Sequence, residues 1–152
     1  MKKLIITTII GTVVYFTVAW VIFEFILGNY TNLHTTQLSG FKKTTEQSSL
    51  GLLILSCASY AALMSFILVY LQNIKNLKRS FLVGSTIGTL VAVMTDTYWY
   101  ATSNFYSNFL VIFFDIFGAG VSVGIMCLAV TLTNQKLDRE RILPWGIMLW
   151  NL

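Results

Sequence analysis

The sequence predicts an all-α membrane protein, a single bundle of four transmembrane helices with both ends of the chain in the cytoplasm. Of its 152 residues, 56% are hydrophobic and only 11% are charged, far less charge than the surface of a soluble domain carries. Four apolar stretches recur along the chain, and each is long enough to cross a hydrocarbon core, which takes about 20 helical residues. No linker rich in Pro, Gly or Ser separates these stretches, so residues 1–152 are expected to form one membrane domain.

The four helices are expected at residues 4–27, 50–71, 81–103 and 109–133. A segment in lipid must satisfy its own backbone hydrogen bonds, so a continuous apolar run of this length is predicted to be helical. Pro144 is the only proline and lies after the fourth stretch, so no span should have a proline kink. The basic start of the chain also fits a signal peptide, but the apolar run is longer than a signal core and no small-x-small cleavage pattern follows it.

Short basic clusters predict the orientation of these helices. Eight of the ten Lys and Arg residues lie before the first helix, between the second and third, or after the fourth. The other two, Lys42 and Lys43, lie in the first loop. Positive residues in short loops favour the cytoplasmic side, so both termini are predicted to be cytoplasmic. The eight residues on that side are Lys2, Lys3, Lys75, Lys78, Arg79, Lys136, Arg139 and Arg141.

Two connections and a C-terminal tail complete the predicted topology. Residues 28–49 form a polar outer loop rich in Thr, Asn and Ser, and a short turn flanked by aromatic residues joins the last two helices. Residues 134–152 form a tail that is too short to span and that begins charged and ends apolar. We expect this tail to lie in the cytoplasmic interface, with Trp145 and Trp150 as anchors at headgroup level. Docking on a partner subunit is the alternative for the same segment.

Three acidic residues lie inside the expected helices: Glu24, Asp96 and Asp115. An ionisable group in hydrocarbon costs roughly 2.5–3.5 kcal/mol on insertion scales, so such groups usually face the bundle interior. Asp96 and Asp115 lie at nearly equal distances from the turn between the third and fourth helices, which predicts a similar depth in the membrane. Glu24 lies close to the outer end of the first helix. The three carboxylates should therefore gather on the extracytoplasmic side.

Small residues at helical spacing predict where the third and fourth helices touch. Ser85, Ala92 and Asp96 share one stripe of the third helix, and Asp115 and Ser122 share the corresponding stripe of the fourth. Lipid provides no hydrophobic drive for helix association, so small residues that allow close van der Waals contact are typical of such interfaces. The glycines expected to allow this packing are Gly84, Gly88, Gly118, Gly120 and Gly124.

These patterns together predict a small acidic pocket that opens outward. It would bind a proton, a cation or a cationic ligand, and two neighbouring carboxylates would share a proton to relieve their repulsion. The alternative is structural, with each acid accepting hydrogen bonds from Ser, Thr, Tyr or Trp and only fixing the helix packing. The candidate pocket residues are Glu24, Asp96, Asp115, Trp99, Tyr98 and Ser122.

The sequence lacks the residue patterns of the common enzyme classes. It has no GxSxG elbow, no Walker motif and no CxxC pair, since Cys57 and Cys127 lie alone in separate spans. His34 is the only histidine, so paired haem ligands and a His/Cys metal cluster are excluded. We therefore expect no catalytic residues, no metal and no cofactor. The basic clusters beside the spans account for the net charge of +4, so nucleic-acid binding is not expected.

Short motifs occur between residues 14 and 133. They are the YFTVAW segment at residues 15–20, Gly28 after the first helix, Ser39-Gly40-Phe41 in the loop, and Asp115-Ile116-Phe117-Gly118 in the fourth helix. In these motifs the chain resembles four-helix bacterial membrane proteins classed as domains of unknown function. The resemblance implies a four-span fold and a role for Asp115, and it implies no particular activity.

The sequence thus favours a non-enzymatic protein of the bacterial inner membrane. It would act in the lipid bilayer as a homo-oligomer or as a subunit beside a partner membrane protein. The alternative is a small proton- or cation-coupled transporter or channel that uses Asp96, Asp115 and Glu24. Exporters of the small multidrug resistance type also have a Glu on the first helix, but their loops are shorter and some insert in both orientations, which the charge bias of this chain opposes.

Overall fold

The computed structural model of the protein describes the backbone of residues 1–35 and 49–149, and the side chains of residues 1–35 and 49–139. This part of the chain is helical apart from short connections and a single isolated bridge between Thr35 and Tyr106. The predicted all-α class is therefore confirmed.

Four helices in the described residues are long and apolar enough to cross a membrane. They cover Lys2–Ile26, Leu50–Leu71, Leu77–Thr102 and Phe109–Arg139. The predicted number of helices able to cross a membrane is thus confirmed, and each predicted helix lies within or close to one of these four. The agreement has a simple cause, because an apolar run of this length can satisfy its backbone in hydrocarbon only as a helix.

The first two spans each end in a wider helical turn. Helix α1 (Lys2–Trp20) continues into the π-helix η1 (Val21–Ile26), and α3 (Leu50–Ser65) continues into the π-helix η2 (Phe66–Leu71). The wider turns end with Leu27 N–H donating to the Ile22 carbonyl and Gln72 N–H donating to the Ile67 carbonyl. π-Turns of this kind often occur at functional sites.

Part of the predicted outer loop is helical. Helix α2 (Gly28–His34) follows η1 directly, so the first residues of the segment 28–49 are ordered. The Tyr30 ring contacts Phe114 edge-on, with the ring centroids 5.3 Å apart, and this tertiary contact holds the polar segment against the bundle. Residues 36–48, which include Lys42 and Lys43 and the Ser39-Gly40-Phe41 motif, lie outside the described residues.

The last two helices are longer than predicted. Helix α4 (Leu77–Thr102) begins four residues before the predicted start, because the Asn76 side chain accepts a hydrogen bond of 3.0 Å from the Arg79 amide and caps the helix. Helix α5 (Phe109–Leu149) continues without a break through most of the segment predicted as a separate tail. Whether that segment lies in a membrane interface stays a prediction; the Trp145 side chain and Trp150 lie outside the described residues.

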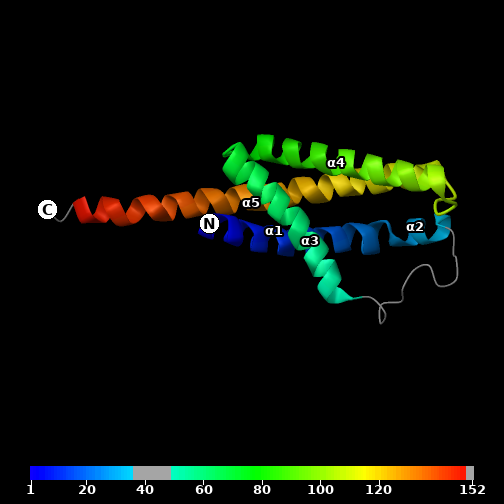
Figure 1. The fold of residues 1–152 in the computed structure, drawn as a ribbon, viewed down its shortest axis with the longest axis horizontal. Helices are drawn as coiled ribbons and strands as arrows, with labels where there is room; N and C mark the ends of the chain where they lie inside the picture. The colour runs from blue at the N-terminus through cyan, green and yellow to red at the C-terminus, as the bar shows by residue number, and fades with distance from the viewer. Residues whose placement is uncertain (36–48, 150–152) are drawn as a thin grey trace.

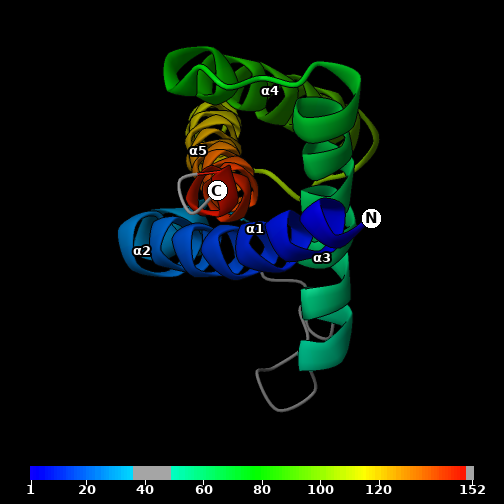
Figure 2. The same cartoon turned by 90° about the vertical axis from the view of Figure 1, so that its left-hand side faces the viewer.

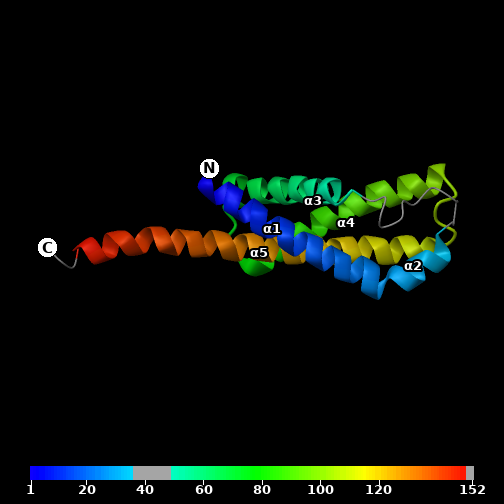
Figure 3. The ribbon, with the colours of Figure 1, turned by 90° about the horizontal axis from the view of Figure 1, so that it is seen from below.

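Helix α5 is the centre of the bundle (Figures 1 and 2). It packs against α4 on one side and against α1 on the other, while α3 crosses α1 obliquely. Seen from below, α5 runs along the whole length of the bundle and extends past the start of α1 (Figure 3). The buried core lies where α3, η2 and the segment after η2 meet α5. Its members are Ala61, Met64, Leu68, Ile74, Val123, Met126, Cys127 and Val130.

Glycines allow the close approach of α4 and α5. A Cβ atom at Gly84 would lie 2.9 Å from the Val123 carbonyl oxygen, and one at Gly88 would lie 3.0 Å from the Ala119 carbonyl oxygen. Gly120 and Gly124 face α4 in the same way. Gly118 differs from the expectation that it lines this interface, because its Cβ position faces Ile22 and other residues near η1. It therefore allows close packing of the first span, not of α4.

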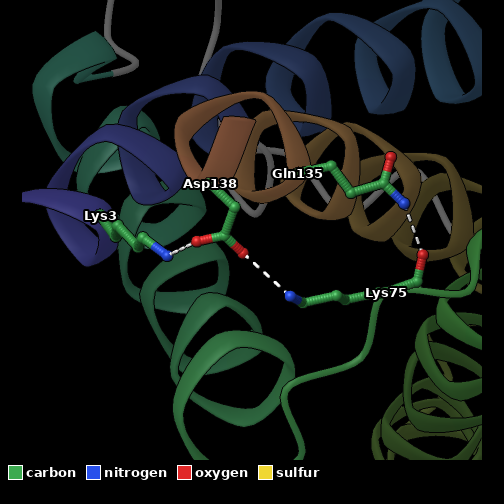
Figure 4. Close-up of polar contacts among 4 residues, drawn as sticks. All are labelled: Lys3, Lys75, Gln135 and Asp138. Carbon is green, nitrogen blue, oxygen red and sulfur yellow. Dashed lines mark hydrogen bonds and ion pairs between the residues drawn. The ribbon is translucent and has the colours of Figure 1, made fainter. Parts of the chain in front are cut away.

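Charged residues meet at the end of the bundle where the chain begins, which we call the basic end. Asp138 of α5 forms ion pairs with Lys3 of α1 and with Lys75, which precedes α4 (Figure 4). Beside them, Gln135 Nε2 donates to the Lys75 carbonyl at 2.5 Å (Figure 4). The opposite end holds the connection between α4 and α5, residues 103–108, and is called the turn end (Figure 1).

Candidate cation- or proton-binding site

Asp96 lies two turns before the end of α4, and its side chain is only 6% exposed. It shares the stripe of small residues that faces α5, so the packing of the two helices buries it. Its Oδ1 atom accepts a hydrogen bond of 3.3 Å from the Tyr106 hydroxyl and one of 3.5 Å from the Thr95 hydroxyl. Its Oδ2 atom is buried and accepts no hydrogen bond from any residue that the structure describes.

Asp115 lies on α5, opposite Asp96, and is half-buried. Its Oδ2 atom accepts from the same Tyr106 hydroxyl, at 3.4 Å. The two carboxyl groups therefore face the same hydroxyl group from neighbouring helices. A carboxylate has no hydrogen to donate, so two ionised acids cannot satisfy each other and both depend on an outside donor.

Tyr106 is the residue that connects the two acids. It lies in the turn between α4 and α5, outside the four spans. Burial raises the pKa of its hydroxyl, and the neighbouring Asp115 and Asp96 carboxylates raise it further. The phenol therefore stays protonated around neutral pH and can donate. Since a hydroxyl has one hydrogen, it can donate to only one of the two acids at a time.

Helix α2 holds this turn in place. The Ser107 amide donates to the His34 carbonyl at 3.0 Å, and the Ser107 hydroxyl donates to the same oxygen at 2.6 Å. Thr35 and Tyr106 form the isolated bridge beside these bonds. The backbone of His34 thus anchors the turn that carries Tyr106.

Two cavities meet at Asp96. The first, which we call the turn cavity, has a volume of about 320 Å³ and is lined by Thr95, Asp96, Trp99, Phe105 and Tyr106. The second, the interhelical cavity, has a volume of about 200 Å³ and lies where the first, second, third and fourth spans face one another. Asp96 and Thr95 line both, so one wall separates the two spaces. Residues of the interhelical cavity include Tyr15, Phe23, Tyr60, Gly88, Asp115 and Ala119.

The other residues of the predicted pocket are placed differently. Trp99 lines the turn cavity. The Tyr98 ring contacts the Trp99 ring edge-on, but Tyr98 is 62% exposed and lines neither cavity. Glu24 is exposed on η1 and lines neither cavity. Ser122 is fully buried, and its hydroxyl donates to the Gly118 carbonyl at 2.8 Å, so it serves helix packing. The structure therefore brings Asp96, Asp115 and Trp99 to one place and leaves the other three outside it.

Three tyrosines of the site have no distinctive sequence signal. Tyr106 looks like one more member of the aromatic belt near the turn, and Tyr15 and Tyr60 lie in apolar spans. In the structure the Tyr15 and Tyr60 rings meet edge-on, with centroids 5.5 Å apart, in the wall of the interhelical cavity. The Tyr60 hydroxyl is buried and forms no hydrogen bond within the described part of the chain. For Tyr15 and Tyr60, the sequence signal of a role in the site is limited to a polar hydroxyl group on an otherwise apolar helix.

No group of three or more His, Cys, Asp or Glu side chains in the described residues could hold a metal ion. The site offers two carboxyl groups, one phenol and one threonine hydroxyl. This donor set suits a proton or a single positive charge better than a multivalent ion, which takes more oxygen ligands.

Comparison with protein-family models, with curated proteins and with solved structures finds no match for this chain. The resemblance to four-helix bacterial membrane proteins therefore stays a prediction.

Proposed function

We propose that the chain is a non-enzymatic protein of the bacterial inner membrane, a subunit or small oligomer that binds one positive charge between Asp96 and Asp115. The charge is a proton or a monovalent cation. The site lies at the turn end, which faces away from the cytoplasm in this proposal.

One observation carries the proposal. Two acids from different helices converge on the single hydroxyl of Tyr106, while the buried Oδ2 atom of Asp96 accepts from no described donor. Two carboxylates that share one donor hydrogen leave a net negative charge in a site surrounded by apolar residues. Such a charge is costly unless a proton or cation neutralises it.

The basic end supports the proposed orientation. Lys3 and Lys75, from two of the predicted cytoplasmic clusters, reach the same carboxylate at that end. Positive residues beside spans favour the cytoplasm, so the Asp96 and Asp115 site would face the opposite side.

The buried core favours binding over conduction. Met64, Met126 and Val130 are fully buried between the acids and the Lys3–Asp138–Lys75 cluster. An apolar layer of this kind blocks the passage of ions, so the site would be reached from the turn end alone.

A small proton- or cation-coupled transporter is the second candidate. The observation that favours it is the wall of Thr95 and Asp96 shared by the turn cavity and the interhelical cavity. A proton or cation bound to Asp96 would be accessible first from one cavity and then from the other. Glu24 has no part in this version, because it lines neither cavity.

The test measures the thermal stability of the purified protein between about pH 5 and pH 8, with and without added monovalent salt. Wild-type stability should fall as the pH rises, because loss of the shared proton leaves two repelling carboxylates. Asp96→Asn and Asp115→Asn should each flatten this dependence, since an amide keeps an acceptor oxygen without a charge.

Glu24→Gln is the matched control and should keep the wild-type pH dependence, because Glu24 is exposed outside the site. An unchanged pH dependence in both aspartate variants would contradict the proposal. Proton uptake by wild-type proteoliposomes, lost in Asp96→Asn, would favour the transporter over the binding subunit.

A further inference from the structure

The walls of the turn cavity are mostly aromatic. Trp99, Phe105 and Tyr106 line it together with Thr95 and Asp96. The Phe105 and Tyr106 rings have centroids 4.8 Å apart and an interplanar angle of 75°, so they form two perpendicular walls. Among the described residues that line the cavity, Asp96 is the only one with a carboxyl or a basic side chain.

An aromatic corner with one carboxylate is suited to a particular class of ligand. Ring faces attract a positive charge through their quadrupole, and aromatic cages bind quaternary ammonium groups in this way. Hard inorganic cations instead require a shell of oxygen ligands. The turn cavity provides few oxygen atoms and three rings, so its chemistry favours an organic cation.

The size and burial of the site agree with this class. The volume of about 320 Å³ lies at the lower end of the range of about 300–1,000 Å³ typical of small-molecule sites. The Asp96 side chain is 6% exposed and lines the cavity, with its Oδ2 atom accepting no hydrogen bond from a described residue. The Oδ2 atom is shielded from the cavity, so Asp96 acts on a ligand there through its negative charge and not through a free acceptor. This suits a ligand that brings a positive charge and needs few oxygen partners.

We propose that the turn cavity binds a small organic ammonium ion, with its charge beside Asp96 and its alkyl groups against Trp99, Phe105 and Tyr106. This inference rests on the proposed function and names the class of its cation. The ammonium group neutralises the pair of acids, and the rings replace the water that it loses on entry. Asp115 adds attraction from α5 through the shared Tyr106 hydroxyl.

The test uses calorimetric titration of the full chain in nanodiscs with choline as the probe. The control ligand is 3,3-dimethyl-1-butanol, which has the shape of choline without its charge. Choline should bind and the neutral alcohol should not. Asp96→Asn should weaken choline binding by about thirtyfold or more, the effect of removing a buried charge partner. Trp99→Leu should weaken it by about fivefold or more, the effect of losing a cation–π contact.

Trp20→Leu is the matched control for Trp99→Leu, because Trp20 is exposed on α1 and lines neither cavity. It should leave choline binding unchanged. If Asp96→Asn does not fold, Trp99→Leu and Phe105→Leu still decide the question, since neither removes a charge from the interior.

The outcomes separate this inference from the proposed function. If choline fails to bind while the two aspartates still control the pH dependence of stability, the ammonium inference is wrong and the charge-binding function stands. If neither choline binding nor that pH dependence is found, both are wrong. Equal binding of choline and the neutral alcohol, or choline binding that Asp96→Asn and Trp99→Leu leave unchanged, would also overturn the inference.

Discussion

Tyr106 connects α4 and α5 through a single hydroxyl group. It donates toward Asp96 at 3.3 Å and toward Asp115 at 3.4 Å, one acid on each of the helices that flank its turn. The raised pKa of the phenol, caused first by burial and then by the two carboxylates, keeps its hydrogen in place around neutral pH. One residue in a turn is therefore a hydrogen-bond donor shared by both acids.

The Tyr106→Phe variant should lower the free energy of unfolding by about 1–3 kcal/mol, because the acids lose their shared donor. The loss should be larger at about pH 8 than at about pH 5, since ionised carboxylates depend more on a donor and Tyr106 itself stays protonated across this range. Denaturation of the purified protein at the two pH values measures the effect.

Tyr100→Phe serves as the control for this prediction. Tyr100 is 45% exposed near the same end of α4 and lines neither cavity. Its substitution should change stability little at either pH. A Tyr106→Phe protein as stable as wild type at both pH values would show that the shared hydrogen bond has no energetic role.

At the scale of helices, α5 holds the bundle together by offering different faces to different partners. Gly120 and Gly124 face α4, whereas Gly118 faces η1 at the end of the first span. At the basic end, Asp138 joins α1 to the segment before α4 through Lys3 and Lys75. Because lipid does not drive helices together, these close contacts and ion pairs determine which helices are neighbours.

The Gly88→Ala variant tests the packing of α4 on α5. Its Cβ atom would lie 2.8 Å from the Val123 Cβ atom and 3.0 Å from the Ala119 carbonyl oxygen, closer than atoms normally approach. We expect a loss of about 1–3 kcal/mol from overpacking, measured as a lower melting temperature in detergent.

Gly51→Ala is the matched control in α3. The nearest atom to its Cβ position, the Ser49 hydroxyl oxygen, is 4.0 Å away, so the added methyl group meets no obstacle. Alanine is the better helix former, and this variant should be as stable as wild type or slightly more so. Equal melting temperatures for the two variants would argue against close α4–α5 packing.

At the scale of the whole molecule, the bundle has two chemically different ends. The basic end collects Lys3, Lys75 and Asp138, and the turn end collects the acids, Tyr106 and aromatic side chains. This polarity matches the predicted asymmetry of Lys and Arg between the two sides of a membrane. It places the candidate site at the end remote from the basic clusters.

Cysteine labelling in intact cells tests the orientation. In a background with Cys57 and Cys127 replaced by alanine, Asn104→Cys at the turn end should react with an impermeant maleimide. Gln72→Cys, between η2 and α4, should react only after the membrane is permeabilised. Both positions are exposed and uncharged, so accessibility and charge balance are matched. The reverse labelling pattern would invert the proposed topology.

The number of spans and their approximate limits could be read from the sequence because they depend on local properties. An apolar run of about 20 residues must be helical in lipid wherever its neighbours lie. The pairing of Asp96 with Asp115 could also be predicted from the sequence. A short turn forces α4 and α5 to be antiparallel, and residues at equal distances from that turn then lie at the same depth.

Only the tertiary structure decided the rest, because it depends on contacts between segments far apart in the chain. The helical start of the outer loop depends on Tyr30 against Phe114, and the direction of Gly118 depends on how α1 crosses α5. The position of Tyr106 depends on its bridge to Thr35 and on the Ser107 bonds to His34. Helical periodicity says which residues share a face, but it does not say which of several apolar helices that face will meet.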